Sequence, residues 1–311
     1  MKKTLLFTAA VLGLSAVSCV KDDDPQMTET TYYDTYSLAI PVAGTPVVSP
    51  TKYVFTIDGV ASTGRMSTDN LVLGGGNVGF TTKPMPYKVG LYNVHGRPMA
   101  FGFLEGTNIA ASGDKEITNY RCQMTNASNT NSDSLLNKLT DVLKANPLSR
   151  PSTSKVSTYL SMQYYYGTEW KVMTFWKDML YTGNTVTRYS SSPAPYVTST
   201  ITYRVAMNLD DAKNYTADVY FFNAKFADNP KAPTLNFVLK GLPLKFTSAG
   251  YEISVENVDP VMVPENTPNT AFPFTEFRLR SNSDLSGIVC SFEVAGRYQG
   301  DFSGNGLYLA K

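Results

Sequence analysis

The chain has 311 residues, in which 27 lysines and arginines balance 26 aspartates and glutamates, and charged residues make up only 17% of the total. Such sparse and balanced charge offers no basic surface to a nucleic acid, so nucleic-acid-binding proteins are excluded. Tyrosine (20 residues) and phenylalanine (16 residues) are abundant, and both favour half-buried strands. The composition therefore predicts an all-β protein with about two domains.

The N-terminus has the pattern of a secretory signal peptide, which we assign to residues 1–18. Two lysines precede an apolar run, Leu5–Val17, and this run is too short for a bilayer core that needs roughly 20 residues. Small residues then lead directly to Cys19. This ending resembles the lipobox of bacterial lipoproteins, in which the cysteine is diacylated and becomes the first residue of the mature chain. An ordinary signal peptide is the alternative.

Residues 19–30 are expected to form a flexible acidic tether. Its charged residues stand beside the lipidated cysteine, and clustered like charges resist packing; they are Lys21, Asp22, Asp23 and Asp24. The segment resembles the surface-export signal of Bacteroidota lipoproteins. The resemblance implies an outer-membrane protein that is held in the membrane by lipid and faces the cell exterior, with the periplasmic face as the alternative. Such an anchor requires no transmembrane helix.

Two strand-rich segments follow, residues 31–128 and residues 197–311, and we expect each to form an antiparallel β-domain. Blocks of similar sequence recur in the same order at an offset of about 167 residues, which predicts a tandem duplication. The blocks pair 36–40 with 203–207, 53–55 with 220–222, 71–82 with 237–248, 87–94 with 251–258 and 120–124 with 288–292. Short connections favour a meander, either closed as a flattened barrel or folded as a sandwich.

Residues 129–196 differ in pattern, and we interpret them as a connecting helix plus extra strands. Ser132 and Asp133 can cap a short helix whose leucines fall on one stripe, and Asn146-Pro147 ends it. From residue 155 to residue 190 the alternation typical of strands resumes. These strands are expected either to complete one sheet or to bridge both.

The C-terminal segment AGRYQGDFSGNGLYLAK contains a Gly-x-Tyr-x-Gly pattern. It resembles segments of Bacteroidota lipoproteins that have calycin-like β-barrels. The resemblance covers only this short stretch. It implies the β class and the compartment, and it implies no activity.

No catalytic constellation is visible, so we predict a protein that is not an enzyme and has neither a cofactor nor a metal site. His95 is the only histidine, which leaves no histidine cluster for a metal. Nucleophile-elbow, zinc-protease and phosphate-loop motifs are absent from the sequence. A glycosidase needs a pair of carboxylates. The candidates are Glu105, Glu116, Glu252, Glu256, Glu276 and Glu293. Strand alternation places several of these six on the outward face.

Cys122 and Cys290 occupy matching positions on the apolar faces of their strands. Separate buried thiols are the expected state, because two independent cores would keep the residues too far apart for a disulfide.

Aromatic side chains provide the one candidate binding surface. Tyr159 and Tyr165 lie on the face opposite the inward stripe of their strand, and Phe175 shares a face with Lys171. An open face of this kind would bind a glycan or an envelope protein; otherwise the helix or the second domain covers it. We therefore predict a non-enzymatic surface lipoprotein that binds a glycan or an envelope protein. A structural role in an envelope complex is the alternative, and a carboxylate-based envelope hydrolase is a distant third.

Overall fold

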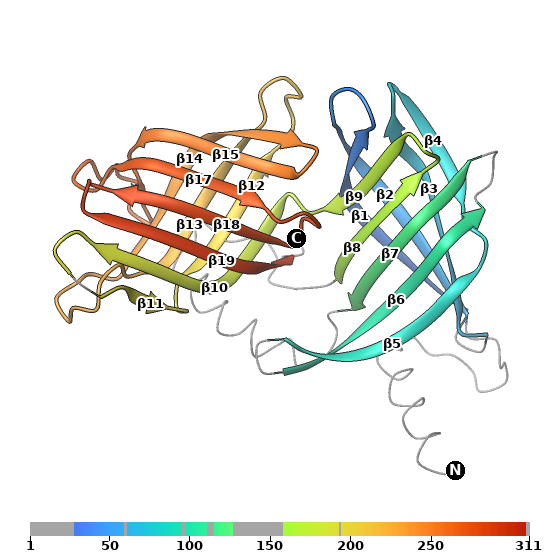
Figure 1. Ribbon diagram of the computed structural model, residues 1–311, viewed down its shortest axis with the longest axis horizontal. Helices are drawn as coiled ribbons and strands as arrows, with labels where there is room; N and C mark the ends of the chain where they lie inside the picture. The colour runs from blue at the N-terminus through green and yellow to red at the C-terminus, as the bar shows by residue number, and fades with distance from the viewer. Residues whose placement is uncertain are drawn as a thin grey trace, which may run out of the picture.

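A computed structural model of the chain describes residues 28–58, 61–94, 97–110, 115–126, 158–192 and 194–308. Several sequence predictions fall outside these residues, namely the signal peptide, Cys19, the charged residues 21–24, His95 and the helix expected after residue 132. All elements in the described ranges are strands, which confirms the all-β prediction there. No described helix is long and apolar enough to cross a membrane. The strands form two curved sheets side by side (Figure 1).

The first sheet is a half-open barrel. Consecutive strands pair antiparallel, except that β3 pairs with both β4 and β5, and β9 returns to pair with β1. The opening lies between β4 and residues 105–110 of β6, because among the described strands β4 pairs only with β3 and that half of β6 only with β7. The strands are β1 (Thr28–Pro41), β2 (Val47–Asp58), β3 (Thr63–Leu73), β4 (Gly76–Thr81), β5 (Met85–Val94), β6 (Arg97–Ala110), β7 (Glu116–Asn126), β8 (Thr158–Tyr166) and β9 (Trp170–Phe175).

The second sheet is a closed barrel of eight strands with two short additions, β11 and β16. Its first strand, β10, pairs with its last, β19, along Met179–Tyr189 and Tyr298–Tyr308. For this sheet the choice between barrel and sandwich is thereby decided in favour of the barrel. The strands are β10 (Asp178–Tyr189), β11 (Tyr196–Thr198), β12 (Thr202–Asn208), β13 (Thr216–Ala224), β14 (Leu235–Thr247), β15 (Gly250–Val258), β16 (Val261–Met262), β17 (Phe274–Ser281), β18 (Gly287–Val294) and β19 (Tyr298–Tyr308).

The two sheets share one cyclic order of strands. In the first sheet the ring is completed by β9, which follows β8 in a hairpin, whereas in the second it is completed by β10, which precedes β12. Only Trp176 and Lys177 separate these two strands. The boundary between the sheets therefore lies at this dipeptide, and the strand-forming part of residues 129–196 contributes to both sheets.

Four of the five pairs of repeated sequence blocks occupy strands at equivalent places in the cyclic order. Blocks 36–40 and 203–207 lie in β1 and β12, and blocks 53–55 and 220–222 lie in β2 and β13. Blocks 87–94 and 251–258 lie in β5 and β15, and blocks 120–124 and 288–292 lie in β7 and β18. In the latter pair the alternation is also in phase, since Cys122 and Cys290 are both buried in the core. In this last pair of blocks, single residues of one copy correspond to single residues of the other.

The other three pairs, which contain residues 36–40, 53–55 and 71–82, do not match residue by residue. Ser37 Oγ shares a hydrogen bond with the core residue Tyr53, so the neighbouring Tyr36 faces the other way, whereas Tyr203 itself points into its barrel. Block 71–82 forms the β3–β4 hairpin, while its counterpart 237–248 lies almost wholly in the single strand β14. A slip of one residue exchanges the two faces of a strand, which is why similar letters here do not mark equivalent positions.

Aromatic rings fill the interior of the second barrel. Tyr203 stacks on Phe302 with ring centroids 3.9 Å apart. Glycines on β19 make room for such rings, since a Cβ on Gly300 would lie 2.2 Å from the ring of Phe292. The glycines of the C-terminal segment therefore serve packing. A fully buried ring of this kind stabilises the fold by roughly 2–3 kcal/mol.

Buried tyrosine hydroxyls are paired inside each barrel. Tyr53 Oη lies 2.8 Å from Ser37 Oγ and 3.0 Å from Tyr164 Oη in the first sheet. In the second barrel the hydroxyls of Tyr181 and Tyr251 lie 2.7 Å apart. Burial raises the pKa of Tyr53 to about 12. Because each hydroxyl has a partner, the neutral phenols are accommodated without an unsatisfied polar atom.

A buried ion pair fixes the start of the second barrel. The carboxylate of Asp178 accepts hydrogen bonds from Arg204 Nε at 2.8 Å and from Arg204 Nη2 at 2.7 Å. The guanidinium also lies 5.1 Å from the ring centroid of Tyr220. Burial alone lowers the pKa of Arg204, but the hydrogen bonds and charge of Asp178 raise it above its ordinary value. This two-point contact attaches β10 to β12 directly after the link from the first sheet.

Candidate functional site: a pocket at the end of the second barrel

A pocket of about 870 Å³ opens at one end of the second barrel. It lies away from the first sheet, because β10 begins beside β9 and the pocket is lined by residues at the far end of β10 (Figure 1). Pockets of this size accommodate whole small-molecule ligands. Its aromatic lining residues are Tyr189, Tyr196, Phe226, Phe237, Phe272, Phe274 and Tyr298.

Three connections between strands form the walls of the pocket. They are residues 190–201, which include β11, residues 225–234, and residues 259–273, which include β16. Side-chain turns shape two of them: Asn229 Oδ1 accepts the backbone N–H of Lys231 at 2.9 Å, and Asn269 Oδ1 accepts that of Ala271 at 3.2 Å. The connections thus have defined conformations of their own.

The strand β16 pairs with the part of β14 that has no pairing with β15. Val261 pairs with Val238, and Met262 pairs with Phe237, while β14 and β15 pair only over Leu244–Thr247 and Gly250–Ile253. Met262 also lines the pocket. The same short strand therefore covers this edge of β14 and contributes to the site.

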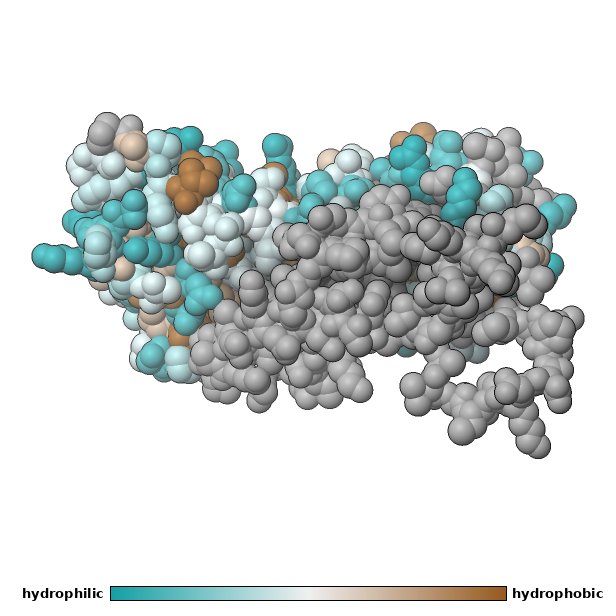
Figure 2. All heavy atoms as spheres, turned by 90° about the horizontal axis from the view of Figure 1, so that it is seen from below, coloured by the Kyte–Doolittle hydropathy of each residue, from teal (hydrophilic) through white to brown (hydrophobic). Residues whose placement is uncertain are grey.

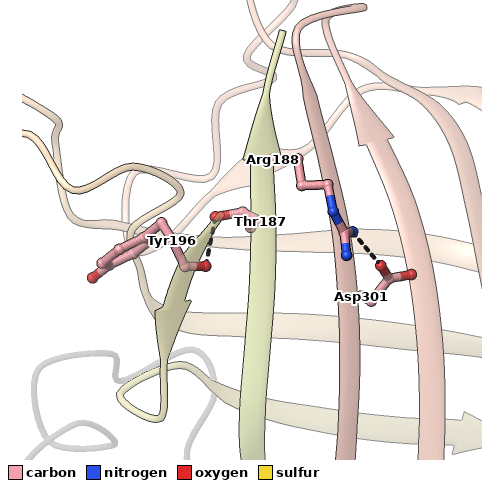
Figure 3. A network of polar contacts seen from close by, with 4 residues as sticks. All are labelled: Thr187, Arg188, Tyr196 and Asp301. Atoms are coloured by element: carbon pink, nitrogen blue, oxygen red, sulfur yellow. Dashed lines mark hydrogen bonds and ion pairs between the residues drawn. The ribbon is translucent and has the colours of Figure 1, made fainter. Parts of the chain in front are cut away.

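Thr187 holds two of the walls against β10. Its hydroxyl donates a hydrogen bond to the carbonyl oxygen of Phe226 at 2.7 Å, and the residue is 1% exposed. The same hydroxyl lies 3.5 Å from the carbonyl oxygen of Tyr196 (Figure 3). The next residue, Arg188, points to the other face of the strand and pairs with Asp301 at 2.9 Å. Alternation along β10 thus gives one residue to the pocket and the next to solvent.

A series of aromatic rings runs from the rim to the floor of the pocket. The ring centroids of Tyr189 and Tyr298 are 4.9 Å apart, and Phe226 follows at 6.2 Å from Tyr298. At the floor, Phe237 and Phe274 lie 5.6 Å apart. Such spacings are typical of packed aromatic pairs, so the floor and one wall form a continuous apolar surface.

Charge is confined to the rim. Asp228 and Lys231, both exposed, are the charged residues among those that line the pocket. Seen from the side of β11, the described surface of the second barrel is mostly hydrophilic and carries one compact apolar patch (Figure 2). Val197 of β11 lines the pocket and is 57% exposed.

Carboxylates do not converge in the pocket. Glu256, Glu276 and Glu293 are register neighbours on β15, β17 and β18, on the outer face of the barrel. Glu116 and Glu252 are exposed, and the side chain of Glu105 lies outside the described residues. Among the lining residues Asp228 is the single carboxylate, whereas a glycosidase uses two. Within the described ranges, no group of three histidine, cysteine, aspartate or glutamate side chains could hold a metal ion.

The predicted aromatic surface is not a continuous open face. Tyr165 is 40% exposed, whereas Phe175 is only 4% exposed and packs against Phe246 of β14, with ring centroids 5.2 Å apart. The backbone of Tyr159 lies in β8, but its side chain lies outside the described residues. For Phe175 the structure corrects the prediction of an exposed ligand-binding residue, because the second barrel covers it.

Cys122 and Cys290 are free and buried. Burial raises the pKa of the Cys122 thiol to about 12 and raises that of Cys290 as well. Both therefore act as small apolar core residues in their own barrels.

Sequence reasoning missed the pocket because its walls are formed by connections between strands. A signal was present: residues 190–201, 225–234 and 259–273 combine prolines with aromatic residues between strands. Long connections of this composition carry binding residues more often than strand interiors do.

Comparison with protein-family models, with curated proteins and with solved structures returns no match to this chain.

Proposed function

We propose that this protein is a non-enzymatic, lipid-anchored receptor of the outer membrane that binds a small extracellular ligand in the pocket of its second barrel. The observation that carries the proposal is the aromatic pocket of about 870 Å³ at the barrel end. A concave, mainly apolar site with a few polar groups at its rim is the usual form of a ligand site.

The lipobox at Cys19 and the acidic residues after it supply the location in this proposal. Lipid at the N-terminus would attach the chain ahead of β1, in the first sheet. The pocket lies at the end of the second barrel that faces away from that sheet. This arrangement supports a receptor whose site is presented at a distance from the membrane.

Binding can be tested without choosing a ligand class. The chain from residue 20 onward, which lacks the lipid but keeps every described residue, would be titrated in parallel with oleate, maltoheptaose and a mixed peptide library. Protein-observed NMR of labelled phenylalanine and tyrosine rings would report the contact site. We expect shifts at Phe226, Phe272 and Tyr298 with at least one of these probes. Shifts confined to other rings would contradict the proposal.

The location has its own test. Cys19→Ala should move the protein from the membrane fraction to the soluble fraction, because the acylated sulfur is removed. Protease treatment of intact cells then separates the two faces of the membrane. Digestion of the wild-type protein supports the exterior, and protection supports the periplasmic face.

A structural role in an envelope complex is the second candidate. The unclosed edge of the first sheet favours it, since no described strand pairs with the outer edge of β4 or with the facing edge of residues 105–110 of β6. A strand from another protein could pair with such an edge. A photocrosslinking residue at Asn77 in β4 would then capture a neighbouring envelope protein in living cells. Crosslinks to solvent or lipid alone would exclude this role for β4.

The duplication remains part of the proposal. The shared cyclic strand order and the equivalent positions of Cys122 and Cys290 support an origin by tandem duplication followed by exchange of the closing strand.

A further inference from the structure

We infer that the ligand of the second-barrel pocket is an amphiphile with an extended apolar body and one polar end, such as a long-chain carboxylic acid. This inference rests on the proposed function and names its ligand class. It selects against a glycan, although aromatic rings by themselves would suit either ligand.

The first argument is the chemistry of the walls. Beside the seven aromatic residues, the lining includes Pro195, Pro233, Pro260, Met262 and Val197. None of these last five side chains carries an N–H or O–H group, and the Met262 sulfur already accepts a hydrogen bond from Asn269 Nδ2 at 3.6 Å. An apolar body gains from this surface along its whole length, whereas a sugar presents hydroxyl groups around its ring that need partners.

The second argument is that the threonine, serine and asparagine side chains of the lining are already engaged, which leaves the hydroxyls of Tyr189, Tyr196 and Tyr298 as its other uncharged polar groups. Thr187 donates to the carbonyl of Phe226, and Ser192 donates to that of Ala194 at 3.2 Å. Asn229 and Asn269 each accept a backbone N–H of their own connection. These groups hold the walls together. A glycan such as maltoheptaose carries many more hydroxyls than three tyrosines can pair with. It would therefore have to break the wall contacts or leave hydroxyls without partners, and either outcome weakens binding.

The third argument is the position of the charged groups. Asp228 and Lys231 both lie on the connection between β13 and β14, and both are exposed. The polar end of the ligand therefore belongs at this side of the rim. The apolar body then extends toward the floor formed by Phe237 and Phe274.

The floor also limits how far the ligand enters. Below Phe237 lies Phe221, stacked on it with ring centroids 4.6 Å apart, and deeper still Tyr203 stacks on Phe302. The barrel interior is thus filled. The ligand occupies the mouth of the barrel and does not pass through it.

The test uses the unlipidated chain from residue 20 onward, so that its own acyl groups cannot occupy the pocket. The fluorescent probe anilinonaphthalene sulfonate is bound first and is then displaced by monomeric oleate or by maltoheptaose. We expect displacement by oleate with a micromolar Kd and no displacement by maltoheptaose.

Two exposed valines provide a matched pair of variants. Val197→Asp places a charge in the pocket lining, whereas Val42→Asp places one at a turn of the first sheet, where the side chain is 83% exposed. Because both positions are largely exposed, neither change disturbs a core. Oleate affinity should fall tenfold or more for Val197→Asp and should be unchanged for Val42→Asp.

The possible outcomes distinguish a failure of the ligand class from a failure of the proposed receptor function. Displacement by maltoheptaose alone, lost in Val197→Asp, would overturn the ligand class and leave the proposed function standing. Equal effects of the two valine variants, or no binding of either probe, would overturn both. Vesicles of dioleoylphosphatidylcholine form a further arm. Binding to vesicles that depends on Val197 would support the apolar ligand and identify a membrane as its source, whereas binding of oleate alone identifies a free amphiphile.

Discussion

The two sheets follow the same strand order and differ in their connections. In the first sheet, residues 59–62 join β2 to β3 and residues 95–96 join β5 to β6. In the second, the corresponding connections are residues 225–234 and residues 259–273, and both line the pocket. Both halves thus share a scaffold of paired strands, and the longer connections of the second half form a pocket on that scaffold.

The strand edges in the two sheets make the same point. Where β14 no longer pairs with β15, it pairs with β16, which comes from the longest of these connections. The free edge of β4 has no such partner among the described strands. The second barrel is closed by its seam between β10 and β19, and the expected effects of variants decrease from this seam to the pocket wall.

The seam of the second barrel offers the most severe test. Gly183 pairs with Gly304, and a Cβ on Gly183 would lie 2.1 Å from the carbonyl oxygen of Ser303. Gly183→Ala should destabilise the second barrel by about 3 kcal/mol or more, because backbone atoms cannot yield as a flexible side chain does. Hydrogen exchange should show lost protection in β19 and retained protection in β1 and β2.

Gly76→Ala is the matched control for the seam, because a Cβ there meets no atom within 4 Å. It should change stability by less than about 0.5 kcal/mol. Similar losses for both variants would show that the seam has no special role.

The buried ion pair comes next in size. Asp178→Ala leaves the guanidinium of Arg204 buried without a countercharge and should cost about 3 kcal/mol in urea unfolding. Asp301→Ala removes the partner of Arg188 in an ion pair whose side chains are 56% and 61% exposed, and it should cost less than about 1 kcal/mol. An equal cost for the two variants would contradict a structural role for the junction pair.

Alkaline pH should destabilise the fold through its buried phenols. Since burial raises the pKa of Tyr53 from 10.0 to about 12, the folded state favours the neutral form, and its contribution is complete below pH 10 and lost as the pH rises toward 12. Tyr53 alone accounts for roughly 3 kcal/mol over this range. Tyrosinate absorbance should rise together with loss of near-ultraviolet circular dichroism. Tyr53→Phe should shift this unfolding to higher pH, and an unchanged midpoint would show that other groups govern it.

The smallest effect concerns Thr187. Thr187→Val keeps the shape of the side chain but leaves the carbonyl of Phe226 without its donor, at a cost of about 1 kcal/mol. Because the walls of the pocket loosen, probe binding should weaken several-fold in fluorescence titrations. Thr185→Val, which removes the hydroxyl contact with Tyr203 deeper in the same barrel, should lose similar stability and retain probe binding.

Alternation predicted strands and their faces well where one face meets a core. In β17 the burial follows the pattern of TEFRLRS, with Phe277 and Leu279 inside and Arg278 outside. Alternation says nothing about which strand lies alongside. The pairing of Thr185 with Phe302, which closes the second barrel, joins distant segments and left no local signal.

The site was less predictable than the strands. The alternation pattern correctly placed Phe175 on the face of its strand that points away from the core of the first sheet. The pattern could not show that the second barrel covers that face. The pocket depends on Phe226, Phe272 and Tyr298, which approach one another only after the barrel has closed. Residues in connections have no period from which their direction can be read.

The position of β19 in the chain determines when the second barrel can be completed. Synthesis proceeds from the N-terminus, so β10 emerges before β19 and must wait for Tyr298–Tyr308 before its free edge is paired. During that interval an unpaired strand is exposed, and such edges invite wrong partners. The first sheet is able to close its β1–β9 ladder as soon as Phe175 has emerged. Protection of the unpaired edge of β10, more than the stability of either core, is therefore the step at which a chaperone would act on the newly made chain.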